Sequence, residues 1–266
     1  EKQQNLYLEY RNLSMPVVNE YIPRDETSFT IIAFPVPAIG ELFPEIFKET
    51  IRINTLDYEL YRDMQQKIID VLDTAEYVEV IGKGENQTNM QVQLAALSNP
   101  EKQTKFENCV ADVNIPLGEV FTSPKLAGTN GILNVGTVYI GDIQYRNLRM
   151  EFKDGRVVSA ICDNFVENGV IDQEAGHRLI VQGIMNGHET LPLGEFAIGT
   201  NTTAYAMAEK FGILDRLPIL IVEKMGPHFA VGDTCYSWSE DSPMYNPDGK
   251  EMIARDNEVS ILRKED

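Results

Sequence analysis

RMEFKDGRVVSA, residues 149–160, decides the fold of this chain. Apolar and polar residues alternate in RMEFK ahead of the Asp-Gly pair at 154–155, a dipeptide that favours the tight turn of a β-hairpin. The segment just before it, GILNVGTVYIG at 131–141, is rich in β-branched residues and glycine. Both segments therefore predict antiparallel strands in the middle of the chain.

The residues ahead of this hairpin predict a different arrangement. SFTIIAFPVP at 28–37 is typical of a buried strand that ends at Pro-x-Pro, and YVEVIGKG at 77–84 is typical of a strand that ends at glycine. Between them, residues 55–75 carry leucine, isoleucine and methionine at steps of three and four, which predicts an amphipathic helix. This β-α-β order favours parallel strands.

The polar stretch 98–108 separates the predicted β-α-β segment from the predicted antiparallel strands, and it suggests a domain boundary. We therefore expect the remnant of an α/β N-terminal domain at 1–112, followed at 113–266 by a mixed α+β domain with a largely antiparallel sheet. Further helices are expected at 173–185 and 202–214. Because the chain starts with EKQQ and no methionine, we expect it to be a piece of a longer protein.

The charge balance excludes two classes of partner. The chain has 41 acidic and 23 basic residues, for a net charge of −18, whereas nucleic acids and anionic membranes are bound by basic surfaces. No apolar run approaches the roughly 18 residues of a membrane span. The three cysteines have no CxxC spacing, which favours free thiols in a reducing cytoplasm.

The tetrapeptide Pro-Leu-Gly-Glu occurs twice, in NIPLGEVFTSP at 114–124 and in LPLGEFAIGTN at 191–201. Each copy places a glutamate, Glu119 or Glu195, after a glycine and before an apolar pair. His228 has the same setting in GPHFAV, where it follows proline and precedes Phe-Ala. A carboxylate in an apolar stretch is costly to bury without a partner, so we expect these side chains to converge from strand edges.

Two carboxylates and an imidazole that converge would suit Zn²⁺, Co²⁺ or Mn²⁺. The alternative is that each glutamate separately caps a helix or pairs with an arginine. The spacing does not decide between them, since the chain has no HExxH or CxxC signature that gathers ligands locally. His177 and His188 lie in polar surroundings and are expected on the surface.

In chain order, NIPLGEVFTSP, LPLGEFAIGTN and GPHFAVGDTCY resemble the three metal-site segments of the aminopeptidase T and aminopeptidase S family. The resemblance covers most of 113–236. It implies a cytoplasmic, dimeric metalloaminopeptidase that removes N-terminal residues from peptides. It also implies two divalent metal ions, which in this chemistry are zinc, cobalt, manganese or magnesium, and a peptide substrate with a free N-terminus.

The resemblance implies roles for individual residues. Glu119, Glu195 and His228 would be metal ligands, and Glu195 would also shuttle the proton of the attacking water. Tyr236 falls where the family has a tyrosine at the metal centre, so its phenol would hydrogen-bond the tetrahedral intermediate or contact a metal. A tyrosine buried in the core is the alternative for Tyr236.

One departure separates this chain from the family pattern. The family closes its site with a His-x-Asp pair after the tyrosine, yet no histidine follows His228, and the nearest acidic pair is Asp256 with Glu258. We expect the missing ligands beyond residue 266. Otherwise the chain is a degenerate, non-enzymatic binding or assembly module. A metal-free glycoside hydrolase could use Glu119 and Glu195 as acid and nucleophile, but that reading leaves His228 unexplained.

Overall fold

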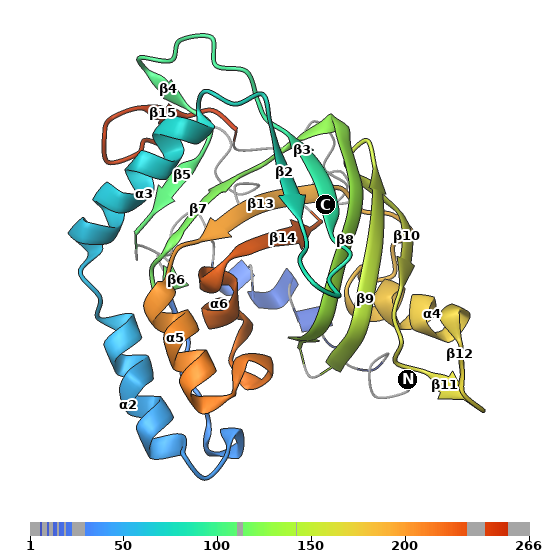
Figure 1. Ribbon diagram of the computed structural model, residues 1–266. Helices are drawn as coiled ribbons and strands as arrows, with labels where there is room; N and C mark the ends of the chain where they lie inside the picture. Colours follow the sequence, from blue (N-terminus) through green and yellow to red (C-terminus); the bar gives the residue numbers. More distant parts are fainter. Residues whose placement is uncertain are drawn as a thin grey trace.

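A five-stranded antiparallel sheet forms the larger β layer of the computed structural model (Figure 1). The structure describes residues 30–110, 114–141, 143–232 and 243–254, together with single positions between 6 and 22. The strands of the large sheet, in spatial order, are β10 (Arg156–Ile161), β9 (Ile143–Lys153), β8 (Lys125–Ile140), β3 (Asn89–Gln93) and β2 (Tyr77–Ile81).

The predicted hairpin of β9 and β10 is confirmed. Lys153 pairs with Arg156, and Asp154 and Gly155 between them both have positive φ, 45° and 68°, as a type I′ turn requires. The β8 strand pairs antiparallel with β9 along most of its length. The middle of the chain is therefore antiparallel, as its alternation of apolar and polar residues indicates.

A second, four-stranded sheet carries the residues singled out as candidate ligands. Its strands, in spatial order, are β14 (Pro227–Val231), β13 (Leu193–Gly199), β7 (Glu119–Thr122) and β5 (Glu107–Cys109), and every neighbouring pair is antiparallel. The β13 strand is interior and pairs with both β7 and β14. Three short pairs complete the β structure: β1 (Ile31–Ile32) with β6 (Asn114–Ile115), β4 (Gln103–Thr104) with β15 (Glu251–Met252), and β11 (Val166–Glu167) with β12 (Val170–Ile171).

Two expectations for the N-terminal part are wrong. Of the strand expected at 28–37, the described residues 30–37 form strand only at Ile31–Ile32, each 48% exposed, because prolines lead into the 3₁₀ turn η1 (Pro37–Ile39). The β2 strand does not join a parallel β-α-β unit. It pairs antiparallel with β3, which follows after seven residues, whereas β1 pairs parallel with β6 in a separate sheet.

The predicted helices at 55–75, 173–185 and 202–214 are confirmed as α3 (Tyr58–Leu72), α4 (Gln173–Gly183) and α5 (Thr202–Phe211). A further helix, α2 (Phe43–Asn54), was not predicted. Shorter helical turns are η2 (Leu214–Arg216), α6 (Ile219–Val222) and η3 (Glu223–Met225). None of the helices in the described part of the chain is long and apolar enough to cross a membrane.

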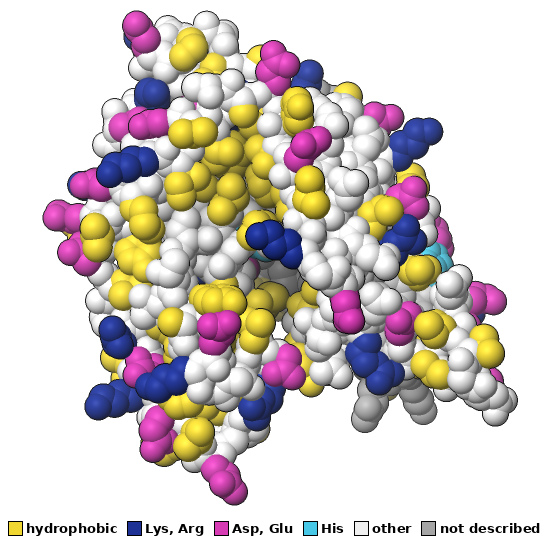
Figure 2. Space-filling model, viewed as in Figure 1, with side chains coloured by type: hydrophobic (Ala, Val, Ile, Leu, Met, Phe, Trp, Pro, Cys, Tyr) yellow, Lys and Arg dark blue, Asp and Glu magenta, His cyan; other side chains and the backbone are white. Residues whose placement is uncertain are grey.

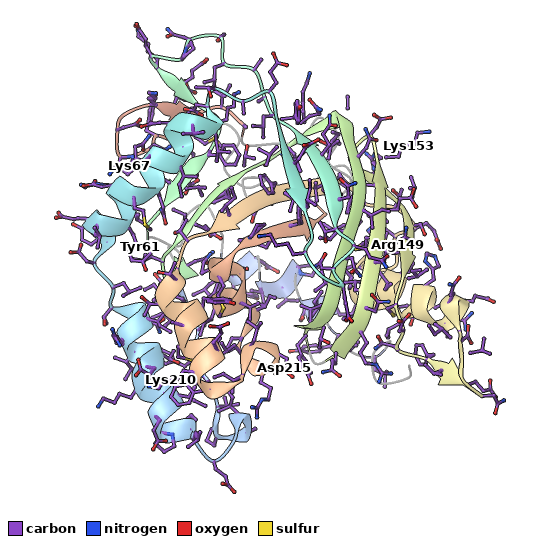
Figure 3. All side chains as sticks on the ribbon, in the orientation of Figure 1. Tyr61, Lys67, Arg149, Lys153, Lys210 and Asp215 are labelled. Atoms are coloured by element: carbon purple, nitrogen blue, oxygen red, sulfur yellow. The ribbon has the colours of Figure 1, made fainter. Side chains whose placement is uncertain are left out.

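The helices cover the sheets by their apolar faces. Helix α3 buries Tyr61 and Ile69 against the four-stranded sheet, while Lys67 on the same helix is exposed to solvent (Figure 3). Helix α4 packs on β10, and α5 packs on α2 in a separate apolar cluster. The largest apolar cluster draws on both sheets and on helices α3 and α4, and it includes Phe106, Tyr145 and Phe196. The fold is therefore mixed α/β with largely antiparallel sheets.

The division expected between residues 112 and 113 stays a prediction. The five-stranded sheet spans it, because β3 from the first part pairs with β8 from the second.

Candidate metal centre

The register of the four-stranded sheet brings the three candidate ligands together. On β13, Glu195, Ala197 and Gly199 project from one face, since alternate residues of a strand share a face. His228 on β14 lies opposite Ala197, and Glu119 on β7 lies opposite Gly199. Directly paired residues also share a face, so all three side chains rise from the same side of the sheet.

The side chains meet around the imidazole of His228. Its Nε2 atom lies 3.2 Å from Oε2 of Glu119 and 3.7 Å from Oε1 of Glu195. Glu119 is buried, with 4% of its surface exposed, and the side chains of His228 and Glu195 are 18% and 17% exposed. Residues that stand 76 and 33 positions apart in the sequence thus share one partly buried cluster.

The two Pro-Leu-Gly-Glu copies reach this cluster by different backbone conformations. Gly118 has a φ of 120° and forms a turn before β7, whereas Gly194 lies inside β13 beside an irregularity in strand register. The turn at Gly118 is hydrogen-bonded by the residues that follow β13. Thr200 N donates to Gly118 O at 2.8 Å, and Asn201 Nδ2 donates to Leu117 O at 3.0 Å. One glutamate therefore follows a turn, and the other lies within a strand.

A buried cation also belongs to the cluster. Lys224, in η3, has no exposed surface, and its Nζ donates to Oε1 of Glu119 and lies 3.1 Å from Oε1 of Glu223. Sequence reasoning missed this residue, because a lysine in the polar run Glu-Lys-Met-Gly reads as exposed. Its position three residues before Pro227-His228 was the only signal available.

The contacts shift the pKa values of this cluster. Burial alone would raise the pKa of Glu119, but its interactions with His228 and Lys224 outweigh burial and lower that pKa to about 2. For His228, burial acts to lower the pKa, yet Glu119 and Glu195 raise it above its ordinary value. The pKa of Lys224 is raised by Glu119 and Glu223 despite burial. Glu119 is therefore ionised at neutral pH.

The family of the chain follows from a match to a protein-family profile. The sequence profile of the thermophilic metalloprotease family M29 matches residues 2–242. The chain belongs to this family. No curated protein matches the chain.

A solved structure agrees in fold. The chain is similar to wild-type AmpT from Thermus thermophilus, with a TM-score of 0.50 and 18% sequence identity, over 76% of this chain and 48% of the AmpT chain. This chain thus spans about half the length of AmpT. At this identity the likeness concerns the fold, and the residues of the site must be judged on their own contacts.

The donor atoms of the cluster are of the chemical types that suit the divalent metal of a metalloprotease. Nδ1 of His228 lies 3.1 Å from the carbonyl oxygen of Gly226, which favours a proton on Nδ1 and makes Nε2 the ring atom that would bind a metal. Nε2 is buried and has no aligned hydrogen-bond partner among the described groups, although Glu119 lies at ion-pair distance. Ligands around a tetrahedral Zn²⁺ with bonds of about 2.0–2.1 Å are roughly 3.4 Å apart, close to both observed contacts.

This M29 chain does not present a preassembled cage. Among the residues that the structure describes, no group of three or more His, Cys, Asp and Glu side chains could hold a metal ion as it stands. Tyr236, the expected phenol of the centre, lies outside the described residues, as do Asp256 and Glu258. His177 pairs with Glu189 at 3.5 Å, and its side chain is 39% exposed, in agreement with its expected surface position.

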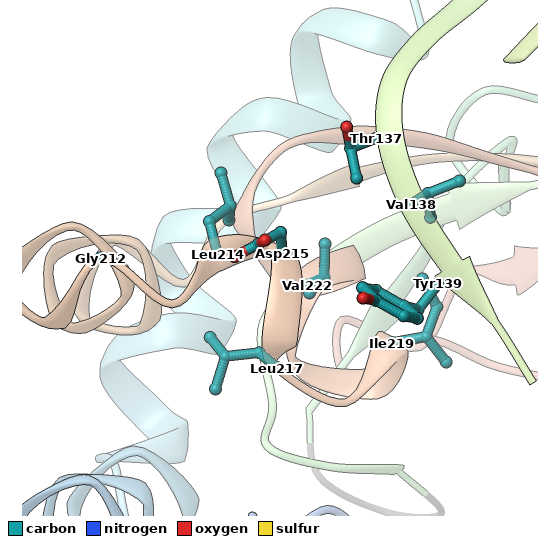
Figure 4. A pocket seen from close by; sticks show the side chains of 9 residues that line it. All are labelled: Thr137, Val138, Tyr139, Gly212, Leu214, Asp215, Leu217, Ile219 and Val222. Atoms are coloured by element: carbon teal, nitrogen blue, oxygen red, sulfur yellow. The ribbon is translucent and has the colours of Figure 1, made fainter. Parts of the chain in front are cut away.

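A cleft of about 480 Å³ opens beside the segment that leads into the cluster. One wall is residues 137–139 of β8, and the other is formed by side chains between 212 and 222 (Figure 4). Its lining is mostly apolar, with Asp215 as its carboxylate. Figure 2 shows hydrophobic side chains around a hollow on this face of the molecule. Val222 lines the cleft and stands two residues before Lys224, so one short segment contributes to both the cleft and the Glu119–His228 cluster.

Proposed function

We propose that the protein to which this chain belongs is a metal-dependent aminopeptidase that hydrolyses the N-terminal residues of peptides. Membership of the M29 metalloprotease family supports hydrolysis of peptide bonds. The observation that carries the proposal for this chain is the convergence of Glu119, Glu195 and His228 on one sheet face. We assign these three as ligands of a two-metal centre, with zinc, cobalt, manganese or magnesium as the candidate ions.

A divalent metal bound here would supply a water nucleophile at neutral pH and polarise the scissile carbonyl. The residues of the chain do the rest. Glu119 on β7 and His228 on β14 come from the strands on either side of β13, and their facing donor atoms lie 3.2 Å apart. Glu195 is partly exposed and takes the proton from the attacking water at its carboxylate. By the family resemblance, Tyr236, which lies outside the described residues, would donate a hydrogen bond from its phenol to the oxygen of the tetrahedral intermediate.

The mostly apolar cleft suits the side chains of a peptide substrate with a free N-terminus. The net charge of −18 supports a protein without nucleic-acid or membrane partners. Cys162 is a buried free thiol, which supports a reducing compartment such as the cytoplasm. A homodimer remains part of the proposal, on the strength of the family resemblance.

A second candidate function is a binding or assembly module that retains the family scaffold. It is favoured by one observation, that the described residues contain no complete metal-binding group. A metal-free glycoside hydrolase is less favoured, because His228 stands between the two carboxylates that such an enzyme would need free.

Metal analysis of the purified chain distinguishes these functions. The aminopeptidase proposal expects near-stoichiometric divalent metal in the wild-type chain and loss of that metal from the Glu119→Gln variant. A chelator should remove the metal and at the same time abolish hydrolysis of an aminoacyl anilide. Ile132→Val, in β8, serves as a matched control. A folded chain that neither contains nor retains added Zn²⁺ or Co²⁺ would reject the metal centre and leave the binding module.

A further inference from the structure

Lys224 has no place in the mechanism above, yet it is the most completely buried charged group of the cluster. Its exposed fraction is 0%. A buried ammonium is stable only when carboxylates and hydrogen bonds compensate for its lost hydration, and Lys224 has two, Glu119 and Glu223. Because no part of the side chain reaches solvent, Lys224 cannot contact a substrate. Its effect must pass through another residue.

The backbone around Lys224 is clamped to the end of β13. The carbonyl of Lys224 accepts from Asn201 N at 2.8 Å, and Gly199 N donates to the carbonyl of Gly226 at 2.8 Å. A Cβ atom on Gly199 would lie 2.3 Å from the carbonyl carbon of Lys224 and 2.5 Å from the carbonyl oxygen of Glu223. Residue 199 must therefore be glycine for the η3 turn to pack this closely against the end of β13, the strand that carries Glu195.

The two oxygens of the Glu119 carboxylate consequently have different partners. Oε1 accepts from Lys224, while Oε2 faces Nε2 of His228. A carboxylate held at one oxygen cannot rotate freely, so the other oxygen stays directed at the imidazole and at the position that a shared metal would take. Carboxylate ligands commonly receive such a hydrogen bond from a residue behind them, which orients the ligand.

We infer that Lys224 is a positioning residue of the metal centre, which fixes Glu119 through Oε1 and presents Oε2 as a single-oxygen ligand. This inference rests on the proposed function. It opposes a simpler expectation, that an ammonium beside a metal site only repels the incoming cation. If repulsion dominated, removal of Lys224 would tighten metal binding. If positioning dominates, removal of Lys224 weakens it.

The test is a titration of the metal-free full chain with Co²⁺, followed by calorimetry and by the visible absorption of the bound ion. We expect Lys224→Met to weaken Co²⁺ binding by about 10- to 100-fold and to change the absorption spectrum, since loss of an orienting partner typically has that effect on metal affinity. Lys224→Gln keeps an N–H donor and should recover part of the affinity. It also tests the inference if the methionine variant does not fold.

Lys105→Met is the matched control. Lys105 is also a buried lysine, with 5% exposed, but its Nζ donates to the carbonyl of Ala75 and not to a candidate ligand. The control should lose stability and leave the Co²⁺ dissociation constant unchanged. Unchanged or tighter Co²⁺ binding by Lys224→Met and Lys224→Gln, beside a wild-type chain that binds, would overturn the inference alone. A wild-type chain that binds no Co²⁺ would overturn the proposed function and the inference with it.

Discussion

Gly199→Ala should be one of the most destabilising single-methyl additions in this chain. The new Cβ would stand 2.3 Å from Lys224 C, 2.5 Å from Glu223 O and 2.6 Å from Gly226 N, where ordinary contacts begin near 3.4 Å. All three neighbours are backbone atoms of a turn held by hydrogen bonds, so relief requires a shift of about 1 Å and the loss of at least one of those bonds. Overpacking of this kind costs about 1–3 kcal/mol, and a lost bond adds about 1 kcal/mol. We expect a loss of roughly 2–4 kcal/mol.

The assay is urea unfolding of the metal-free chain, followed by circular dichroism, with the free energy of unfolding taken by linear extrapolation. Gly136→Ala in β8 is the matched control, because a Cβ there meets nothing within 4 Å and the residue has no positive φ. That variant should stay within about 0.5 kcal/mol of wild type. If the two variants unfold at the same urea concentration, the η3 turn is not clamped as described, and the account of Lys224 loses its structural basis.

Two further predictions address the helix α3 end and the cleft. Asp73 is half-buried, and burial raises the pKa of its carboxyl group in the folded protein. Its contribution to the free energy of unfolding is therefore fully present below the ordinary pKa of 3.8 and is lost as the pH rises through the pKa of the folded state. Asp73→Asn should therefore gain stability relative to wild type between pH 3 and 7 in urea unfolding; a constant difference would contradict the assignment. Val222→Trp should fill the cleft beside Ile219 and raise KM for an apolar aminoacyl anilide with little change in kcat. An unchanged KM would show that the cleft does not bind the substrate.

Local signals predicted those parts of the fold whose structure is decided locally. The Asp154-Gly155 pair specifies its own turn, and Asn201 caps α5 by accepting from Ala204 N at 2.9 Å, as its place before a helical run indicates. Helix α2 gave a weaker signal, because β-branched residues such as Ile51 and Ile53 lower helix propensity. Its stability depends on packing against α5, which no local pattern reveals.

Long-range pairing accounts for the failures in the N-terminal half. The alternation in β2 indicates a strand but does not specify its partner, and the return to β3 depends on the turn that follows Ile81. The candidate ligands were predicted from the residues around Glu119, Glu195 and His228, and the structure brings these three together. Lys224 could not be found in this way, because its burial follows from the close approach of Gly199.

The order of strands in the four-stranded sheet has a consequence for how this protein folds. Glu119 and Glu195 belong to adjacent strands, β7 and β13, yet about 70 residues and most of the large sheet lie between them in the sequence. Pairing so distant in sequence is slow to form, because the intervening chain must be ordered before the contact stabilises anything. The third side chain arrives only with β14, so a nascent chain that has emerged as far as β13 still lacks His228. Binding of a metal at all three side chains would therefore report that the four-stranded sheet has been completed.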